Sequence, residues 1–314
     1  MTNRVKVLYM GTPDFAVPAL KVLEKRADIE IVGVVTQPDK QRGRGHKFQP
    51  TPVKAAAEEL KIPVFQPEKV KDEAFLELLE KLTPELIVVA AYGKILPSQV
   101  INYPKYGCIN IHASLLPKYR GAAPIHWCLI NGEQKTGVTI MQMDEGLDTG
   151  DMLYQKEYTI IDTDTTGILF DKMSELGAMA LDEALDKLFE GTLVPEKQDD
   201  SLSCYSPMID KDICKIDFNK TAREISNLVR GLNPFPGAKL YTSDGKMYKI
   251  LFAEDCNEST TKSPGTIIDG KANIKIAAGD GTVLKILTLQ PEGSKAMSTY
   301  DYLRGHLFDK DIIL

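Results

Sequence analysis

The chain has 314 residues, of which 43% are hydrophobic and 26% are charged, so it has the composition of a globular protein with room for two domains. Its 38 Lys and Arg against 44 Asp and Glu leave a net charge of −6, which argues against a general nucleic-acid-binding protein. No apolar run approaches the roughly twenty residues that span a bilayer. The first residues pass directly into a strand-like segment, so we expect no signal or transit peptide and a cytoplasmic location.

The cysteines and histidines show no metal-binding pattern. The five cysteines are odd in number and scattered, and no two form a Cys-x-x-Cys pair. Such usage is typical of free thiols in a reducing compartment. The four histidines also lack the spacing of metal ligands, so we expect no metal site.

The first hundred residues alternate between strand and helix patterns. Strands are predicted over 5–10, 29–36, 62–65 and 86–91, and helices over 16–25, 52–60 and 71–82. The run at 86–91 is apolar throughout, as expected of a central parallel strand buried on both faces. This alternation predicts an α/β fold with a doubly wound, mostly parallel sheet. The turn after the first strand lacks the G-x-G-x-x-G pattern, so no dinucleotide site is indicated.

A basic segment follows the second predicted strand. It contains Lys40, Arg42, Arg44 and Lys47, with glycines on both sides of Arg44. Most such segments are solvated surface loops. A loop that follows a parallel strand, however, lies at the carboxyl edge of the sheet, where ligands bind in this architecture. Its position therefore favours a phosphate-binding loop, in which Lys and Arg neutralise nucleic-acid phosphates.

Three polar residues in the stretch from 108 to 152 offer acyl-transfer chemistry. Asn110 and His112 alternate along a predicted strand, so their side chains project from the same face about 7 Å apart. Asp148 follows in a Gly-Leu-Asp-Thr-Gly turn between predicted strands at 137–142 and 152–159. An amide can hold a developing oxyanion, an imidazole can move protons, and a carboxylate can orient the imidazole and stabilise its charge. We therefore expect these three side chains to meet in one pocket.

The remainder of the chain predicts a second domain. Two helices are expected first, over 122–131 and from a cap at 163–165 to about Gly191, and then residues 192–208 become rich in Pro, Asp, Ser and Gln. A helix over 221–231 and short β-like runs around 248–253, 265–268, 273–277 and 283–289 follow. We predict a catalytic domain at 1–191, a linker at 192–208 and a small OB-like β-barrel at 209–314. The barrel region has 15 Lys and Arg against 14 Asp and Glu, so any nucleic-acid contact must come from local basic patches.

The order of the motifs resembles one enzyme family. Asn110-x-His112, the Ser-Leu-Leu-Pro run at 114–117 and Asp148-x-Gly150 resemble the signature of the formyltransferases that use 10-formyltetrahydrofolate. Further segments at 11–16, 38–54, 120–125 and 230–238 are similar to the branch of that family that formylates methionyl-tRNA. The resemblance extends over most of the chain.

The resemblance implies a specific reaction and a set of roles. It implies transfer of a formyl group from 10-formyltetrahydrofolate to the α-amine of initiator methionyl-tRNA, in support of translation initiation. Asn110 would bind the oxyanion, His112 would relay the amine proton to the leaving nitrogen, and Asp148 would stabilise the imidazolium. The resemblance places folate against Ser114, Leu115, Leu116 and Pro117, and the tRNA acceptor stem against Lys40, Arg42, Arg44 and Lys47. We expect a monomer that contacts tRNA with both domains.

Two other functions remain open at this point. A nucleotide-sugar N-formyltransferase shares the catalytic set, but its acceptor does not need a basic loop that holds a phosphate backbone. A tRNA-binding or folate-sensing protein without catalysis would not need Asn110, His112 and Asp148 together. His126, on a predicted helix, receives no catalytic role, because the family that the chain resembles usually has Gln at that place.

Overall fold

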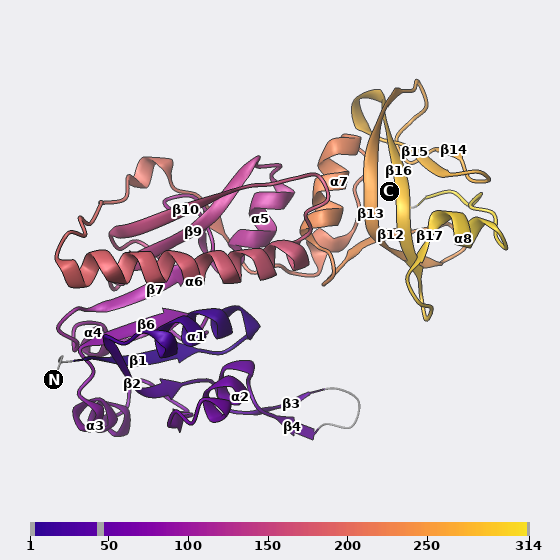
Figure 1. Cartoon of the computed structure of the whole chain (residues 1–314). Coiled ribbons are helices and arrows are strands. Elements are labelled where there is room, and N and C mark those ends of the chain that lie inside the picture. Colours follow the sequence, from indigo (N-terminus) through magenta and orange to yellow (C-terminus); the bar gives the residue numbers. More distant parts are fainter. Residues whose placement is uncertain (1–3, 43–46, 313–314) are drawn as a thin grey trace. The chain divides into compact units, whose positions relative to one another are not determined.

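The computed structural model describes residues 4–42 and 47–312, and these form two compact units (Figure 1). The first unit contains Met1–Gly121, Thr136–Tyr158 and Phe170–Tyr205. The second contains Ala122–Lys135, Thr159–Leu169 and Ser206–Leu314. The second unit therefore includes two segments from upstream of the predicted linker. The linker at 192–208 stays a prediction of where a protease would separate the two domains.

The first unit is built on a seven-stranded sheet with the order β10-β9-β7-β6-β1-β2-β5. The strands are β1 (Val5–Gly11), β2 (Ile29–Val35), β5 (Val64–Phe65), β6 (Leu86–Ala90), β7 (Cys108–His112), β9 (Lys135–Gln142) and β10 (Met152–Thr159). The five strands from β5 to β7 in this order pair in parallel, whereas β9 is antiparallel to β7. Starting from β1, the chain adds β2 and β5 on one side of it and then β6, β7, β9 and β10 on the other side. The order of the strands therefore reverses at β1. The predicted doubly wound, mostly parallel sheet is confirmed.

The helices of this unit follow the predicted pattern, apart from a four-residue helix at 98–101 that was not predicted. They are α1 (Val17–Lys25), α2 (Pro52–Glu59), α3 (Glu73–Leu82), α4 (Ser98–Ile101) and most of α6 (Thr166–Glu190), whose first residues belong to the second unit. Glycine lets α6 approach β7 closely, because a Cβ atom at Gly177 would lie 2.8 Å from Cγ2 of Ile111. Ile111 therefore faces α6. Its neighbours Asn110 and His112 point to the opposite face of the strand, away from the helix.

The basic segment is partly a hairpin instead of a loop. Strand β3 (Lys40–Arg42) pairs antiparallel with β4 (Lys47–Gln49). The sequence did not indicate these two strands, because their polar residues show no apolar pattern. At its base, the Asp39 carboxylate accepts hydrogen bonds from Lys54 Nζ and Gln66 Nε2, each at 2.7 Å. These two donors lower the pKa of Asp39. The predicted phosphate contact Arg44 lies outside the described residues.

The second unit is built on a separate six-stranded sheet. Its main path is β12-β13-β16-β15-β14, and β17 adds to β16; the pairings are antiparallel. The strands are β12 (Ala238–Tyr241), β13 (Met247–Ser259), β14 (Ile267–Asp269), β15 (Ile274–Ala277), β16 (Thr282–Pro291) and β17 (Met297–Ser298). The helices are α5 (Pro124–Ile130), α7 (Ala222–Gly231) and α8 (Thr299–Leu303). A capping box between Thr221 and Glu224 starts α7. The predicted second β-sheet is confirmed as a separate antiparallel sheet, and the OB-like barrel stays a prediction.

A single apolar core holds the second unit together. Phe218, Ile250 and Leu284 are fully buried in it, and Tyr248 and Tyr302 contact edge to face and share a hydrogen bond between their hydroxyl groups. The strand β12 was not predicted, since its four residues alternate too briefly to stand out from the turn before it.

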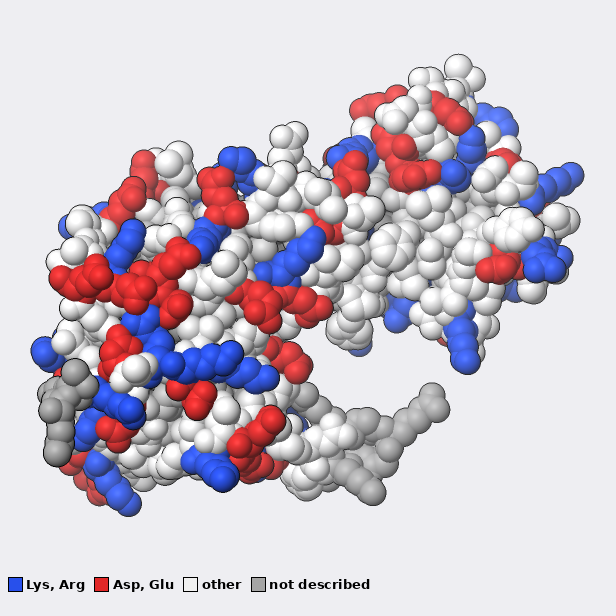
Figure 2. All heavy atoms as spheres, viewed as in Figure 1, with Lys and Arg blue, Asp and Glu red and all other residues white. Residues whose placement is uncertain are grey.

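Charges of both signs are mixed on the face of the molecule that Figure 2 shows. On the face shown in Figure 2, Lys and Arg are interspersed with Asp and Glu and do not gather into one broad basic field. None of the helices in the described ranges is both long enough and apolar enough to cross a membrane.

Candidate active site

The end of β7 presents two of the predicted catalytic side chains. Asn110 pairs with Val89 of β6 and Met141 of β9, and His112 pairs with Thr139 of β9, so neighbouring strands hold both residues in register. His112 is 6% exposed, whereas Asn110 is only half-buried. Within the described chain, the Asn110 amide makes no hydrogen bond. Its N–H groups therefore remain available to a ligand.

The imidazole of His112 is oriented from both of its nitrogen atoms. Nε2 lies 2.9 Å from the Tyr119 carbonyl oxygen. A carbonyl can only accept, so Nε2 carries a hydrogen in both charge states of the ring. Nδ1 is then the atom that gains or loses a proton, and it lies 3.7 Å from Oδ2 of Asp148. The ring nitrogen that can exchange a proton and the Asp148 carboxylate thus face each other.

Backbone groups hold the carboxylate in this place. The Gly121 N–H donates to Oδ2 of Asp148 at 2.9 Å. Asp148 has φ of +54° and Tyr119 has φ of +62°, in the left-handed region that non-glycine residues seldom adopt. Both residues contact His112. Unusual backbone conformations persist where the surrounding structure over-determines them, often at functional sites.

The turn before β10 has little freedom. Asp144 accepts hydrogen bonds from the Thr149 hydroxyl at 2.8 and 2.9 Å and from the Gly146 N–H at 3.0 Å. A Cβ atom at Gly150 would lie 1.8 Å from the Gln142 carbonyl oxygen, so no larger residue fits there. The Gly-Leu-Asp-Thr-Gly sequence is therefore explained by packing on both sides of Asp148.

The predicted folate-contacting run at 114–117 is a tightly bonded turn. The Ser114 hydroxyl donates to the Lys118 carbonyl at 2.7 Å. The hydroxyl of Thr139 donates to the Ser114 carbonyl and accepts from the Leu116 N–H. Gln155 Nε2 donates to the Leu116 carbonyl at 2.9 Å. These bonds fix the shape of the run beside His112, and its contact with folate stays a prediction.

The structure therefore brings Asn110, His112 and Asp148 to one site at the end of β7. Sequence reasoning missed the Tyr119 carbonyl and the Gly121 N–H, because backbone groups leave no signature in residue type. In the described ranges, no three His, Cys, Asp or Glu side chains are grouped so that they could hold a metal ion. A free amide donor, a buried imidazole and a carboxylate can transfer an acyl group to an amine by acid–base chemistry and oxyanion stabilisation.

The family of the chain is defined over nearly its whole length. A model of the formyl transferase family matches residues 3–185, and a model of the formyl transferase C-terminal domain matches residues 208–307. The chain is thus a member of the formyl transferase family. Methionyl-tRNA formyltransferase of Caldanaerobacter subterraneus subsp. tengcongensis is 49% identical over 99% of this chain and 100% of its own. That of Geobacter metallireducens is 50% identical over 96% of both. The chain belongs to the methionyl-tRNA formyltransferase family.

Solved structures share the fold at much lower identity. The sugar 3N-formyl transferase WlaRD, solved in the presence of dTDP and 5-N-formyl-THF, has a TM-score of 0.69 and 20% identity, and the match covers 93% of this chain and 100% of WlaRD. An N-formyltransferase of Helicobacter canadensis, in complex with folinic acid and dTDP-3-aminofucose, has a TM-score of 0.68 and 22% identity over 91% and 99%. At such identities the likeness shows the fold alone.

Proposed function

We propose that this chain transfers the formyl group of 10-formyltetrahydrofolate to the α-amine of methionyl initiator tRNA. The observation that carries the proposal is the meeting of Asn110, His112 and Asp148 in a chain that matches methionyl-tRNA formyltransferases from end to end. The product would be the formylated initiator used in translation. The same reasoning makes formyltetrahydrofolate and initiator tRNA the partners of the chain.

The reaction assigns one task to each side chain. The amine nitrogen attacks the formyl carbon, and the carbonyl oxygen becomes an oxyanion. The unpaired amide of Asn110 donates to that oxygen; loss of one such donor typically costs roughly 10²–10³ in rate. Nδ1 of His112 takes the proton that the amine loses and delivers it to N10, directly or through water, as the bond between the formyl carbon and N10 breaks. Asp148 stabilises the imidazolium that exists between these two steps.

The folate and tRNA contacts extend the proposal beyond the catalytic residues. The turn formed by Ser114, Leu115, Leu116 and Pro117 adjoins His112 and is proposed to contact folate. The basic hairpin is proposed to contact the acceptor stem through Lys40, Arg42, Arg44 and Lys47. The bonded base at Asp39 supports this role, since a hairpin with a fixed base can carry cations toward a backbone at a defined place.

A comparison of acceptors tests the proposal directly. The purified chain would receive 10-formyltetrahydrofolate with either methionyl-tRNA or a nucleotide-linked amino sugar, and the formylated product would be measured. We expect formylation of methionyl-tRNA, and none in an Asn110→Ala variant above about 1% of the wild-type rate. This variant is a sound control, because the half-buried Asn110 amide bonds to no described residue and its loss should leave the fold intact. Formylation of the sugar with no formylation of methionyl-tRNA would overturn the proposal.

A further inference from the structure

The predicted linker returns to the turn that carries Asp148. Glu196 and Met152 exchange two backbone hydrogen bonds of 2.8 Å, which places the following residues beside the end of that turn. Two residues later, the side chain of Gln198 reaches across to Asp148, 50 positions earlier in the chain. The segment is therefore part of the wall of the site and not a free tether.

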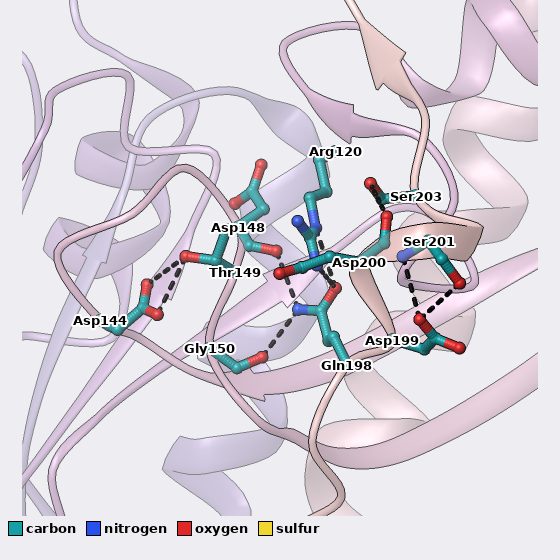
Figure 3. A network of polar contacts seen from close by, with 10 residues as sticks. All are labelled: Arg120, Asp144, Asp148, Thr149, Gly150, Gln198, Asp199, Asp200, Ser201 and Ser203. Carbon is teal, nitrogen blue, oxygen red and sulfur yellow. Dashed lines mark hydrogen bonds and ion pairs between the residues drawn. The ribbon is translucent and has the colours of Figure 1, made fainter.

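Every polar atom of the Gln198 side chain is engaged (Figure 3). Nε2 donates to the carbonyl oxygens of Asp148 at 2.8 Å and Gly150 at 2.7 Å. Oε1 accepts from Nε and Nη2 of Arg120 at 3.0 and 2.9 Å. A guanidinium can only donate and a carbonyl can only accept, so these partners fix which way round the amide lies. Gln198 thus bridges the turn and Arg120 with no bonding capacity left over.

The bridge ends on the segment that holds the catalytic pair. Arg120 lies between Tyr119, whose carbonyl binds Nε2 of His112, and Gly121, whose N–H binds Oδ2 of Asp148. This three-residue segment therefore contacts His112 through Tyr119 and Asp148 through Gly121. The other end of the bridge holds the backbone of Asp148 itself, at an unfavourable φ of +54°.

The Asp200 contact of Arg120 is solvent-exposed. Its guanidinium also lies 2.7 Å from Oδ1 of Asp200, whose side chain is 82% exposed. Ion pairs with so exposed a partner are screened by water and are worth little. The Arg120 side chain is itself only 11% exposed, and the Gln198 oxygen accepts two hydrogen bonds from this shielded guanidinium.

We propose that Gln198 is a positioning residue for formyl transfer, which holds the Asp148 turn against the 119–121 segment so that Asp148 faces Nδ1 of His112. The inference rests on the proposed function for its reaction but not for its geometry. It assigns a catalytic consequence to a segment outside both matched family domains, since 186–207 lies between them.

Three single variants test the bridge. Gln198→Ala removes it and should lower kcat about 10- to 100-fold, as expected when a catalytic group is misplaced by about 1 Å. Gln198→Glu keeps the shape and the acceptor for Arg120 but has no donor for the two carbonyls, so it should be as damaging. KM for both substrates should stay within about twofold, because the loss concerns the transition state. Glu196→Gln, an exposed change on the same segment, should keep wild-type kcat.

A double-mutant cycle separates positioning from general stability. If Gln198 acts through Asp148, Gln198→Ala should cost little in an Asp148→Asn background, where the charge that it positions is already gone. Multiplicative losses in the double variant, or wild-type kcat in Gln198→Glu, would overturn the inference. The wild-type chain is assayed in the same series with the amine acceptor that it formylates. If the wild-type chain does not formylate methionyl-tRNA, that result counts against the proposed function. The Gln198 variants would still be compared with wild type on the acceptor that the wild-type chain formylates.

Discussion

Replacing Asp148 by Asn should remove the negative charge beside His112 and leave the turn in place. Asn has the shape of Asp, and its side-chain oxygen can still accept the Gly121 N–H that now bonds to Oδ2 at 2.9 Å. Asn also adopts the left-handed conformation of residue 148, where φ is +54°, more readily than most residues. The substitution therefore isolates the charge from the geometry of the turn.

The size of the effect follows from the distance between the two groups. Oδ2 of Asp148 lies 3.7 Å from Nδ1 of His112, and their side chains are 16% and 6% exposed. At an effective dielectric constant of about 20, unit charges at this distance attract by about 4 kcal/mol. In the proposed mechanism His112 accepts the proton of the amine, so lost stabilisation of the imidazolium raises the barrier. At 1.36 kcal/mol per tenfold, the rate of formyl transfer should fall roughly 10²- to 10³-fold.

The measurement is a single-turnover formylation of methionyl-tRNA with enzyme in excess, which reports the chemical step. Folate affinity should be unchanged. Glu145→Gln provides the matched control, because it makes the same carboxylate-to-amide change on an exposed side chain of the same turn. A rate for Asp148→Asn within about threefold of wild type would refute the reasoning, since it would leave under 1 kcal/mol for the charge.

Three further predictions concern the turn, the second unit and the basic hairpin. Gly150→Ala should lower both kcat and the unfolding temperature, because its Cβ would lie 1.8 Å from the Gln142 carbonyl; Gly191→Ala, with φ of +71° and no atom within 4 Å, should cost only about 1 kcal/mol in unfolding free energy. Burial lowers the pKa of His126 below its ordinary 6.5, against an opposing hydrogen bond to the Phe235 backbone. As pH falls through 6.5, the unfolded chain therefore binds this proton before the folded chain does, and the free energy of unfolding declines until the pKa of the folded state is passed. Urea unfolding at pH 7.5 and 5.5 should show a smaller decline of that free energy in His126→Gln than in wild type. Equal declines would contradict this prediction. Replacing Lys40, Arg42, Arg44 and Lys47 should weaken methionyl-tRNA binding and reduce its log-log salt slope by about 0.7 to 0.9 per lost contact, with Arg44→Ala the most damaging and folate affinity unchanged. An unaltered salt slope and tRNA KM in Arg44→Ala would leave the hairpin as a solvated surface feature.

The site could be predicted from the sequence only where side chains carry the chemistry. Asn110 and His112 were predicted on one face of a strand, and the structure places them there with Asp148 beside His112. Two partners of His112 and Asp148 are backbone groups, the Tyr119 carbonyl and the Gly121 N–H. Residue type indicated neither these groups nor the left-handed φ values of Tyr119 and Asp148. Asp is tolerated at such φ values, but Tyr is not an expected choice.

The sequence by itself determined the alternation of strands and helices, because apolar periodicity is a local property of the chain. The central strands at 5–11 and 86–90 and the helix at 222–231 are examples. Tertiary structure alone decided that residues 196–200 belong to the site. Their polar composition is typical of a linker, and only the fold brings Gln198 to Asp148 and Arg120, 50 and 78 positions away. A hydrogen-bonding side chain has no preference for a distant partner until the sheet has placed both ends, so this contact could not be predicted from local pattern.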